Sequence, residues 1–344
     1  MSAGVGGQSR GPWASTWARV RRDRATVAAM VALAVILALS LFGGAIATRV
    51  LGHNGAEPFP YAAGGIDLRP VGPWSHVPAT DVTRLDEYSN VLPPPKGTPT
   101  TLFPLGADGP LGRDELIRLL DGGRTSLEVA LGGMLVALLI AIPIGCAAGY
   151  FGGFVDTVVS RFTETLMAFP LLLFLVFASA KLSSTLNPIA YSWVVPRGVV
   201  SDALLIGVFT AFYPIRLIRA QLLTLRHAEF VAAEHMIGAS DFRTLRSHLL
   251  PHLWPTLLVW AGIAVATNIL LEVSLSFIGV GVAASTPTWG SMLSTAWGTI
   301  YTPRLHESTV WQTLLPTIGI LVTVIALNQL SEGLRHALEP WSRR

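Results

Sequence analysis

One polar segment in the second half of the chain gathers residues that could form a functional surface. Residues 229–251, EFVAAEHMIGASDFRTLRSHLLP, stand between two long apolar runs. Acidic Glu229, Glu234 and Asp241 occur together with basic Arg243 and Arg246, so the segment could make ionic contacts with another surface. Its composition fits an ordinary surface loop with two helical turns equally well.

The spacing of apolar residues predicts two short amphipathic helices in this segment. Gly238 can adopt the left-handed conformation that ends the first helix, and Ser240 or Asp241 can cap the second. Pro251 is expected to close the segment, because proline belongs in the first turn of a helix or beyond its end. The residues that recur at steps of three and four are Phe230, Ala233 and Ile237, then Phe242, Leu245 and Leu249.

Polar residues inside apolar runs form a second set of candidates, because ionisable groups within a membrane often mark a transport pathway. Arg161 and Glu164 are three residues apart, which favours an ordinary helical ion pair. Glu272 is open to two interpretations, a lining or gating residue of a pathway or a hydrogen-bonded anchor between helices. We therefore take Glu164, Asn268 and Glu272 as candidate pathway residues.

Several kinds of chemistry lack their sequence signatures. The chain contains no GxxxxGK[ST] phosphate loop and no HExxH, GxSxG or CxxC motif. Its single cysteine, Cys146, lies in an apolar run, and His235 and His248 are expected at a surface rather than on a metal. We therefore expect no catalytic residue, no metal site and no cofactor held by this chain, which is predicted not to be an enzyme.

Composition indicates a protein that crosses a membrane several times. Hydrophobic residues make up 51% of the 344 residues and charged residues 13%, and the mean hydropathy is +0.54. The net charge of +3 rests on arginine and shows no interleaving with aromatic residues, so nucleic-acid binding is not expected. The predicted fold class is an all-α polytopic membrane protein.

Six apolar runs are long enough to span a bilayer as helices. We expect a cytoplasmic tail at 1–24, an extracytoplasmic segment at 48–124, a transmembrane core at 125–336 and a cytoplasmic tail at 337–344. Cleavage of the first run as a signal peptide is an alternative to its being a permanent helix. The six predicted spans are 25–47, 127–150, 158–180, 199–222, 253–282 and 311–330.

The segment between the first two spans is predicted to lie outside the cytoplasm. Residues 53–99 are rich in proline and lack periodicity, so a long surface loop is favoured over a small lid. Leu116, Ile117, Leu119 and Leu120 then form an apolar face, which predicts a helix lying on the membrane surface.

The distribution of basic residues predicts the orientation, because short cytoplasmic loops carry more Lys and Arg than external ones. Six spans put both termini on one side, and that side also receives the polar segment. We therefore expect both termini and residues 229–251 in the cytoplasm. The basic residues on that side include Arg19, Arg21, Arg22, Arg24, Arg226, Arg243, Arg246, Arg335, Arg343 and Arg344, against Lys181, Arg197 and Arg304 in the short opposite loops.

The polar segment resembles the EAA loop in the membrane subunits of ABC importers, which inserts into a groove of the ATPase subunit. Glu229, Ala233 and Gly238 match motif positions, whereas Ala232 and Glu234 stand where glutamate and alanine are usual. The resemblance implies an ATPase-coupling role for a set of loop residues. They are Glu229, Phe230, Ala233, Glu234, Gly238, Ala239, Asp241, Arg243, Arg246, Leu250 and Pro251.

Two further stretches resemble the dipeptide and oligopeptide group of these importers, which includes nickel permeases. PLGADGPLGRDE begins at Pro104, with Phe103 and Ala107 replacing the usual histidine and threonine. LEVSLSFIGVGVAASTPTWGSML covers 271–293. The three motifs together are most similar to the C-type permease, a type I importer fold of six transmembrane helices.

The resemblance implies that the chain moves di- or oligopeptides across the bacterial plasma membrane. The implied partners are a second, B-type permease in a heterodimer, two ATPase domains that bind ATP and Mg, and an extracytoplasmic solute-binding protein. A permease for nickel or another small solute is an alternative. An ATP-independent secondary transporter and a non-transporting membrane scaffold are alternatives of other classes.

Overall fold

The computed structural model describes residues 17–63, 70–78, 95–109, 111–190, 198–283, 285–300 and 307–342. Several sequence predictions concern residues outside these ranges. They are the first 16 residues of the N-terminal tail, much of the proline-rich insertion, Arg197, Arg304, Arg343 and Arg344.

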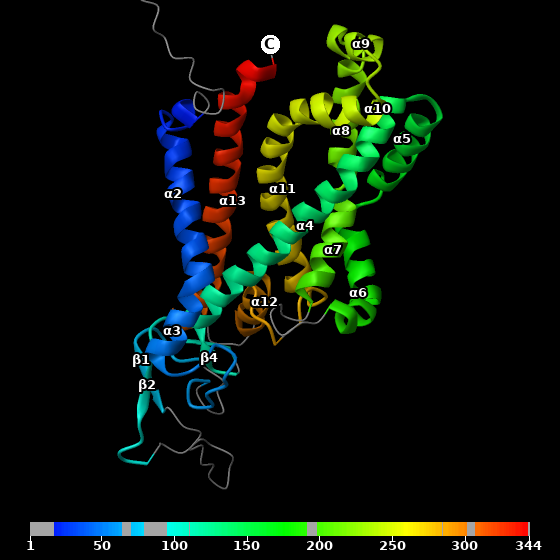
Figure 1. The fold of residues 1–344 in the computed structure, drawn as a ribbon. Helices are drawn as coiled ribbons and strands as arrows, with labels where there is room; N and C mark the ends of the chain where they lie inside the picture. The colour runs from blue at the N-terminus through cyan, green and yellow to red at the C-terminus, as the bar shows by residue number, and fades with distance from the viewer. Residues whose placement is uncertain are drawn as a thin grey trace, which may run out of the picture.

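Within these ranges, four helical stretches are long and apolar enough to cross a membrane (Figure 1). The first combines α2 (Arg24–Ala38), the π-helical turn η1 (Leu39–Gly43) and α3 (Gly44–Leu51). The second is α4 (Glu115–Phe151), and the fourth lies within α13 (Glu307–Ser342). The third joins α10 (Asp241–Thr244), the π-helical turn η3 (Leu245–Leu249) and α11 (Leu250–Ile278).

Two further spans are bent pairs of helices. α5 (Gly153–Met167) and α6 (Leu171–Ala190) meet at 87°, and α7 (Val199–Thr210) and α8 (Phe212–Leu225) meet at 40°. Proline lies at both breaks, Pro170 before α6 and Pro214 in the first turn of α8, where it cannot donate a helical hydrogen bond. With each bent pair counted as one span, the part of the chain that the structure describes has six, so the predicted helical multi-pass fold is confirmed.

Three predicted boundaries differ from the structure. The third predicted span, 158–180, is not a single straight helix but crosses the break at Pro170, and Lys181 lies within α6 rather than in an external loop. The first helix continues to Leu51, and α4 starts at Glu115 rather than near residue 127. Asp114 explains the early start, since its carboxylate accepts the backbone N–H of Ile117 at 3.0 Å and caps the helix.

The expected membrane-surface helix is therefore the first turns of α4. Ile117 is completely buried by protein rather than facing lipid.

The described part of the external segment forms a small folded unit, which we call the cap (residues 52–63, 70–78, 95–109 and 111–114). Strands β1 (Ser75–Pro78) and β2 (Thr100–Phe103) pair antiparallel, as do β3 (Ala107–Asp108) and β4 (Arg113–Asp114). Phe59, Ala62, Val77, Phe103 and Ala107 form its core. These residues have more structure than the surface loop that the sequence favours, because apolar side chains far apart in the sequence meet here.

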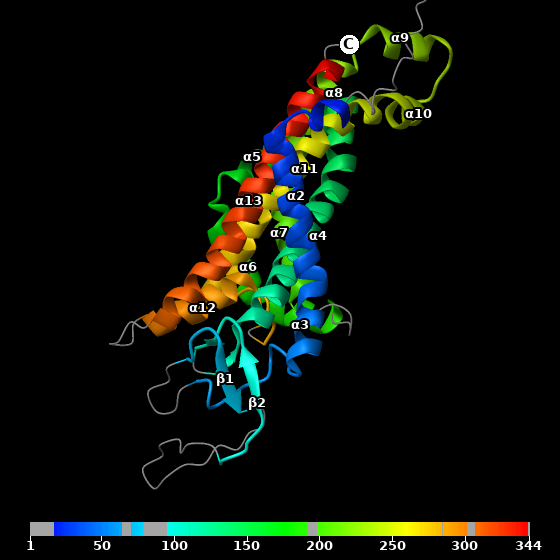
Figure 2. The same ribbon diagram turned by 90° about the vertical axis from the view of Figure 1, so that its left-hand side faces the viewer.

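α4 is the central helix of the bundle and packs against α7, α8 and α11. Its small residues permit close approach: a Cβ atom added to Gly145 would lie 2.8 Å from Ile218, and one added to Gly149 would lie 2.7 Å from Leu222. α2 lies along α13 at one side, and α12 (Trp289–Ile300) packs between α11 and α13 (Figure 2). The cap and the polar segment lie at opposite ends of this bundle (Figure 1).

Candidate functional site

The polar segment projects from the end of the bundle where the C-terminal end of α13 also lies (Figures 1 and 2). α9 (Glu229–Met236) is followed by a turn at Gly238 and then by α10, so the predicted helix, turn and helix are present. Gly238 has a φ of +81°, and an added Cβ would meet nothing within 4 Å. Glycine is therefore favoured here by its backbone conformation and not by crowding.

The second helix of the segment does not end at Pro251. α10 leads through η3 into α11 as one continuous helix from Asp241 to Ile278, and Pro251 lies in the first turn of α11. The π-helical turn η3 changes the spacing of the backbone hydrogen bonds between α10 and α11, and such turns occur inside helices without ending them. A displacement of the segment would therefore act directly on a membrane-spanning helix.

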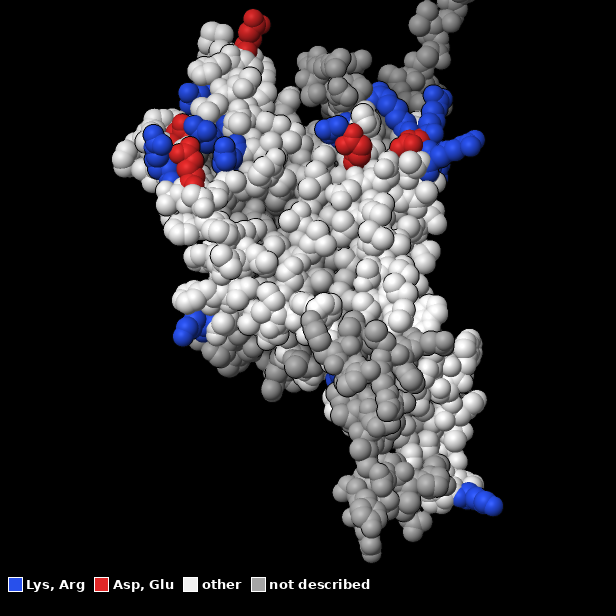
Figure 3. Space-filling model, turned by 180° about the vertical axis from the view of Figure 1, so that it is seen from behind, with Lys and Arg blue, Asp and Glu red and all other residues white. Residues whose placement is uncertain are grey.

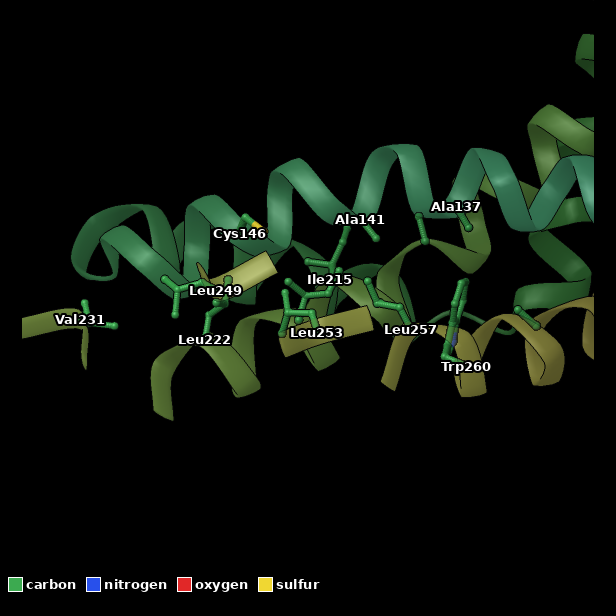
Figure 4. Close-up of a cluster of buried hydrophobic side chains, with 13 residues drawn as sticks. Ala137, Ala141, Cys146, Ile215, Leu222, Val231, Leu249, Leu253, Leu257 and Trp260 are labelled. Carbon is green, nitrogen blue, oxygen red and sulfur yellow. The ribbon is translucent and has the colours of Figure 1, made fainter. Parts of the chain in front are cut away.

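The inner face of the segment belongs to the largest apolar core of the bundle (Figure 4). Val231 of α9 is 3% exposed and Leu249 of η3 is 0% exposed. Both pack in the cluster that includes Cys146 of α4 and Leu222 of α8. Leu249 was among the predicted apolar positions, whereas Val231 was missed because it falls outside the regular spacing of the first helix.

Polar contacts also fasten the inner face. The Tyr150 hydroxyl, at the end of α4, donates to an Asp241 carboxylate oxygen at 2.8 Å. The Glu234 carboxylate of α9 contacts ring nitrogen Nδ1 of His248 in η3. The rings of Phe230 and His252 stack with their centroids 5.6 Å apart. The two short helices are thus bound to each other and to α4 and α11.

The outer face of the segment exposes large apolar side chains. Met236, Ile237 and Phe242 are 82%, 84% and 71% exposed, and we call these three residues the outer patch. Ile237 and Phe242 belong to the apolar spacing from which the two helices were predicted, but they are exposed, and Val231, Leu245 and Leu249 provide the packing. Among the other coupling candidates, Glu229, Ala233, Arg243, Arg246 and Pro251 are exposed, and Ala239 and Leu250 are partly buried.

The candidate pathway residues are not brought together. Glu164 is half-exposed and accepts a hydrogen bond from Arg161 at 3.2 Å, which is the predicted helical pair. Asn268 and Glu272 are completely buried on α11, where Asn268 donates to the Ala130 carbonyl at 3.1 Å. Glu272 accepts from the Ser276 hydroxyl at 2.7 Å, a hydrogen bond within α11 that does not decide between a pathway residue and an anchor between helices. A pathway role for these residues stays a prediction.

Sequence reasoning missed one buried carboxylate, Asp202 in the first turn of α7. It is completely buried, and neither carboxylate oxygen has a hydrogen-bond partner among the residues that the structure describes. The signal was present in the sequence, since an aspartate interrupts the apolar run that begins at Val199.

The PLGADGPLGRDE motif builds a buried ionic network where the cap meets α4. Asp108 pairs with Arg113 and, at 3.0 Å, with Arg118 in the second turn of α4. Asp114 caps α4 and contacts the His53 ring nitrogen Nε2 at 3.1 Å. Burial lowers the pKa of His53, but the hydrogen bond and charge of Asp114 outweigh it and leave the pKa raised above 6.5.

Comparison with known protein families decides the identity of the chain. The family described as binding-protein-dependent transport system inner membrane component matches residues 141–344. This match covers the polar segment and every span from α5 onward.

The chain is a member of that family.

Three relatives with named functions align with two thirds or more of this chain. The dipeptide transport system permease protein DppC of Alkalihalophilus pseudofirmus is 32% identical over 67% of this chain and 69% of its own. The di/tripeptide transport system permease protein DppC of Pseudomonas aeruginosa is 32% identical over 69% of this chain and 72% of its own. The glutathione transport system permease protein GsiD of Pectobacterium atrosepticum is 27% identical over 96% of this chain and 92% of its own.

Membership makes the chain a multi-pass permease of an ABC importer, and such permeases work with ATPases and a binding protein. The inner face is fixed to the permease core, and the outer patch is free to contact a partner.

Proposed function

We propose that this chain is the C-type permease subunit of a peptide importer and is coupled to its ATPases through residues 229–251. One observation carries the proposal: the segment buries one face in the core of the bundle and exposes large apolar side chains on the other. Exposed apolar residues beside arginine are typical of a protein interface rather than of a solvated loop.

The mechanism follows from the contacts of the two faces. ATP binding closes the ATPases, and they move the outer patch. Val231 and Leu249 transmit this movement into the core, and the Tyr150–Asp241 hydrogen bond transmits it to α4. Because η3 and α11 are continuous, α11 tilts with the segment. The movement shifts the transport equilibrium only if the outer patch binds the two ATPase states with different affinity.

The orientation is part of the proposal, with both termini and the polar segment in the cytoplasm of a bacterium. Charge distribution supports it: on the face shown in Figure 3, most Lys and Arg of the described residues gather at the end that carries α9 and the C-terminal turns of α13. Cytoplasmic ends of membrane proteins are enriched in these residues. The cap then lies outside, where a solute-binding protein would dock.

The complete importer is proposed to contain a second, B-type permease and two ATPase domains that bind ATP and Mg. Peptides are the proposed substrate, supported by the dipeptide, di/tripeptide and glutathione permeases among the relatives. Uptake of radiolabelled dipeptide by vesicles with the whole importer tests this substrate. If the vesicles take up nickel and dipeptide does not compete with this uptake, the substrate is the metal and not a peptide.

Co-purification tests the coupling role. The double variant I237D/F242D places charge on the outer patch and leaves the inner face intact. We expect the ATPases to purify with the wild-type chain and with the control S247D, whose added charge lies at an exposed position of the same segment. They should be lost from I237D/F242D. Full retention of the ATPases by I237D/F242D, with the second permease also present, would contradict the coupling surface.

A further inference from the structure

An open groove of about 460 Å³ lies between α11 and α13, near the end of the bundle that carries the polar segment. It is separate from the buried Asn268 and Glu272. Its apolar part is lined by Val259, Ile263 and Ile325, and its polar part by Asn328, Gln329, Ser331, Glu332 and Arg335.

The groove changes in character along α13. Ile325, Asn328, Glu332 and Arg335 recur at steps of three and four residues and therefore share one helix face. This face passes from apolar to amide to charged side chains toward the C-terminal end of the helix. Charged Glu332 and Arg335 are ordinary near a helix end, but amide side chains such as those of Asn328 and Gln329, further into a membrane helix, are costly against lipid chains and usually lie beside protein or a water-filled cavity. The groove therefore has the lining of an aqueous passage.

The polar end of the groove presents one negative and one positive group side by side. A guanidinium nitrogen of Arg335 lies 2.7 Å from a Glu332 carboxylate oxygen, and His336 contacts the same oxygen at 2.9 Å. Arg335 and Glu332 are both about half-exposed and both line the groove. An ammonium group complements the carboxylate, and an acid group complements the guanidinium.

We propose that this groove is the cytoplasmic end of the substrate passage and binds a short zwitterionic peptide. Glu332 accepts from the peptide ammonium, Arg335 donates to its carboxylate, and Asn328 and Gln329 hydrogen-bond its amides. The apolar wall formed by Val259, Ile263 and Ile325 contacts the peptide side chains. The inference rests on the proposed function, since it requires that peptides cross this permease.

Cysteine labelling tests whether the groove is open and filled with water. Cys146 is the single cysteine of the sequence and is buried, so a second cysteine can be labelled selectively. In the nucleotide-free importer, N328C should react with a membrane-impermeant maleimide added from the cytoplasmic side. L321C is the control, since Leu321 is exposed on the same helix outside the groove. Equal, negligible labelling of N328C and L321C would overturn the passage, because lipid or the second permease would then fill the groove.

Protection of N328C identifies the occupant. A dipeptide with free termini should slow labelling several-fold, and an N-acetylated, C-amidated dipeptide should protect about tenfold less well, as expected for the loss of charge-assisted contacts. Equal protection by the two dipeptides would contradict recognition of the zwitterion. Protection by vesicles of zwitterionic phospholipid, without protection by dipeptide, would assign the groove to a lipid headgroup instead.

Transport by charge variants separates this inference from the proposed function. E332Q and R335Q should raise the KM for free dipeptide about tenfold with the ATPases still bound. The matched control is R124Q/E128Q, which removes an i,i+4 ion pair of α4 outside the groove and should leave KM unchanged. Peptide transport with an unchanged KM in E332Q and R335Q would overturn the groove and leave the proposed function standing. Absence of peptide transport by the wild-type importer would instead overturn the proposed function.

Discussion

The cap and the polar segment both lie outside the apolar part of the bundle, but they use their polar residues in opposite ways. In the cap, Asp108, Asp114 and His53 are buried and contact other residues of the same chain. In the polar segment, Arg243 and Arg246 are exposed beside the outer patch. Charge in the cap therefore holds this chain together, whereas the charges of Arg243 and Arg246 in the polar segment remain available to a partner.

This difference separates residues needed for folding from residues that we propose to couple the permease to its ATPases. A change in the cap should reduce the free energy of unfolding, because it leaves a buried charge without its partner. A change in the outer patch should reduce partner binding and leave the fold intact. A change in the inner face of the polar segment should reduce both the free energy of unfolding and partner binding, because this face joins the outer patch to the core.

The largest effect on stability is expected from D108A. The substitution leaves Arg113 and Arg118 buried without the carboxylate that both contact, and breaking such a buried pair costs about 3–5 kcal/mol. Thermal unfolding of the purified chain in detergent measures it. E128Q is the control, because it breaks the more exposed Arg124–Glu128 pair and should cost less than about 1 kcal/mol. A similar loss of stability in D108A and E128Q would show that the buried ion pairs of the cap stabilise the chain no more than an exposed pair does.

The two faces of the polar segment should respond differently to truncation. L249A opens a cavity in the core and should cost about 2–5 kcal/mol. F242A removes an exposed ring and should change stability by less than about 0.5 kcal/mol, while weakening ATPase binding. Thermal unfolding and ATPase titration of the two variants measure both quantities. A large loss of stability in F242A would mean that the outer patch is part of the core.

The smallest effect is a pH dependence of the cap. Asp114, together with the charge of Glu57, raises the pKa of His53 above 6.5, so the protonated ring stabilises the cap fully below that pH. This contribution, about 1 kcal/mol, is lost as the pH rises through the raised pKa.

Thermal unfolding between about pH 5 and about pH 9 should show this loss in the wild type and not in H53Q. H76Q, at an exposed histidine of β1, should keep the pH dependence of the wild type. An identical pH profile in H53Q and the wild type would show that His53 does not cause the pH dependence of stability.

Much of the fold could be predicted from the sequence because long apolar runs dictate membrane helices. Gly238 predicted the turn of the polar segment, since its backbone requirement is local, whereas Ser240 lies at the N-cap of α10 without the predicted side-chain capping hydrogen bond. The exposure of Ile237 and Phe242 could not be predicted from spacing, because it depends on which face meets α4 and α8. Local sequence likewise did not reveal the break at Pro170 or the pairing of β1 with β2 across residues 79–99.

The buried roles of the motif residues needed the three-dimensional structure for the same reason. Asp108 and Arg118 are ten positions apart, yet they meet because the chain turns between β3 and α4. The groove between α11 and α13 was also missed, because Glu332 and Arg335 lie near a helix end where charged residues are ordinary. Their significance depends on Asn328 and Gln329 beside them.

The number of peptides moved per ATP hydrolysed tests most directly the claim that the polar segment transmits movement through its inner face. The double variant Y150F/E234Q removes the contacts with Asp241 and His248 and leaves the outer patch unchanged. In proteoliposomes that contain the whole importer, we expect it to keep its ATPases and hydrolyse ATP, with a clearly lower ratio of peptide to ATP than the wild type. A wild-type ratio with both contacts removed would contradict the account.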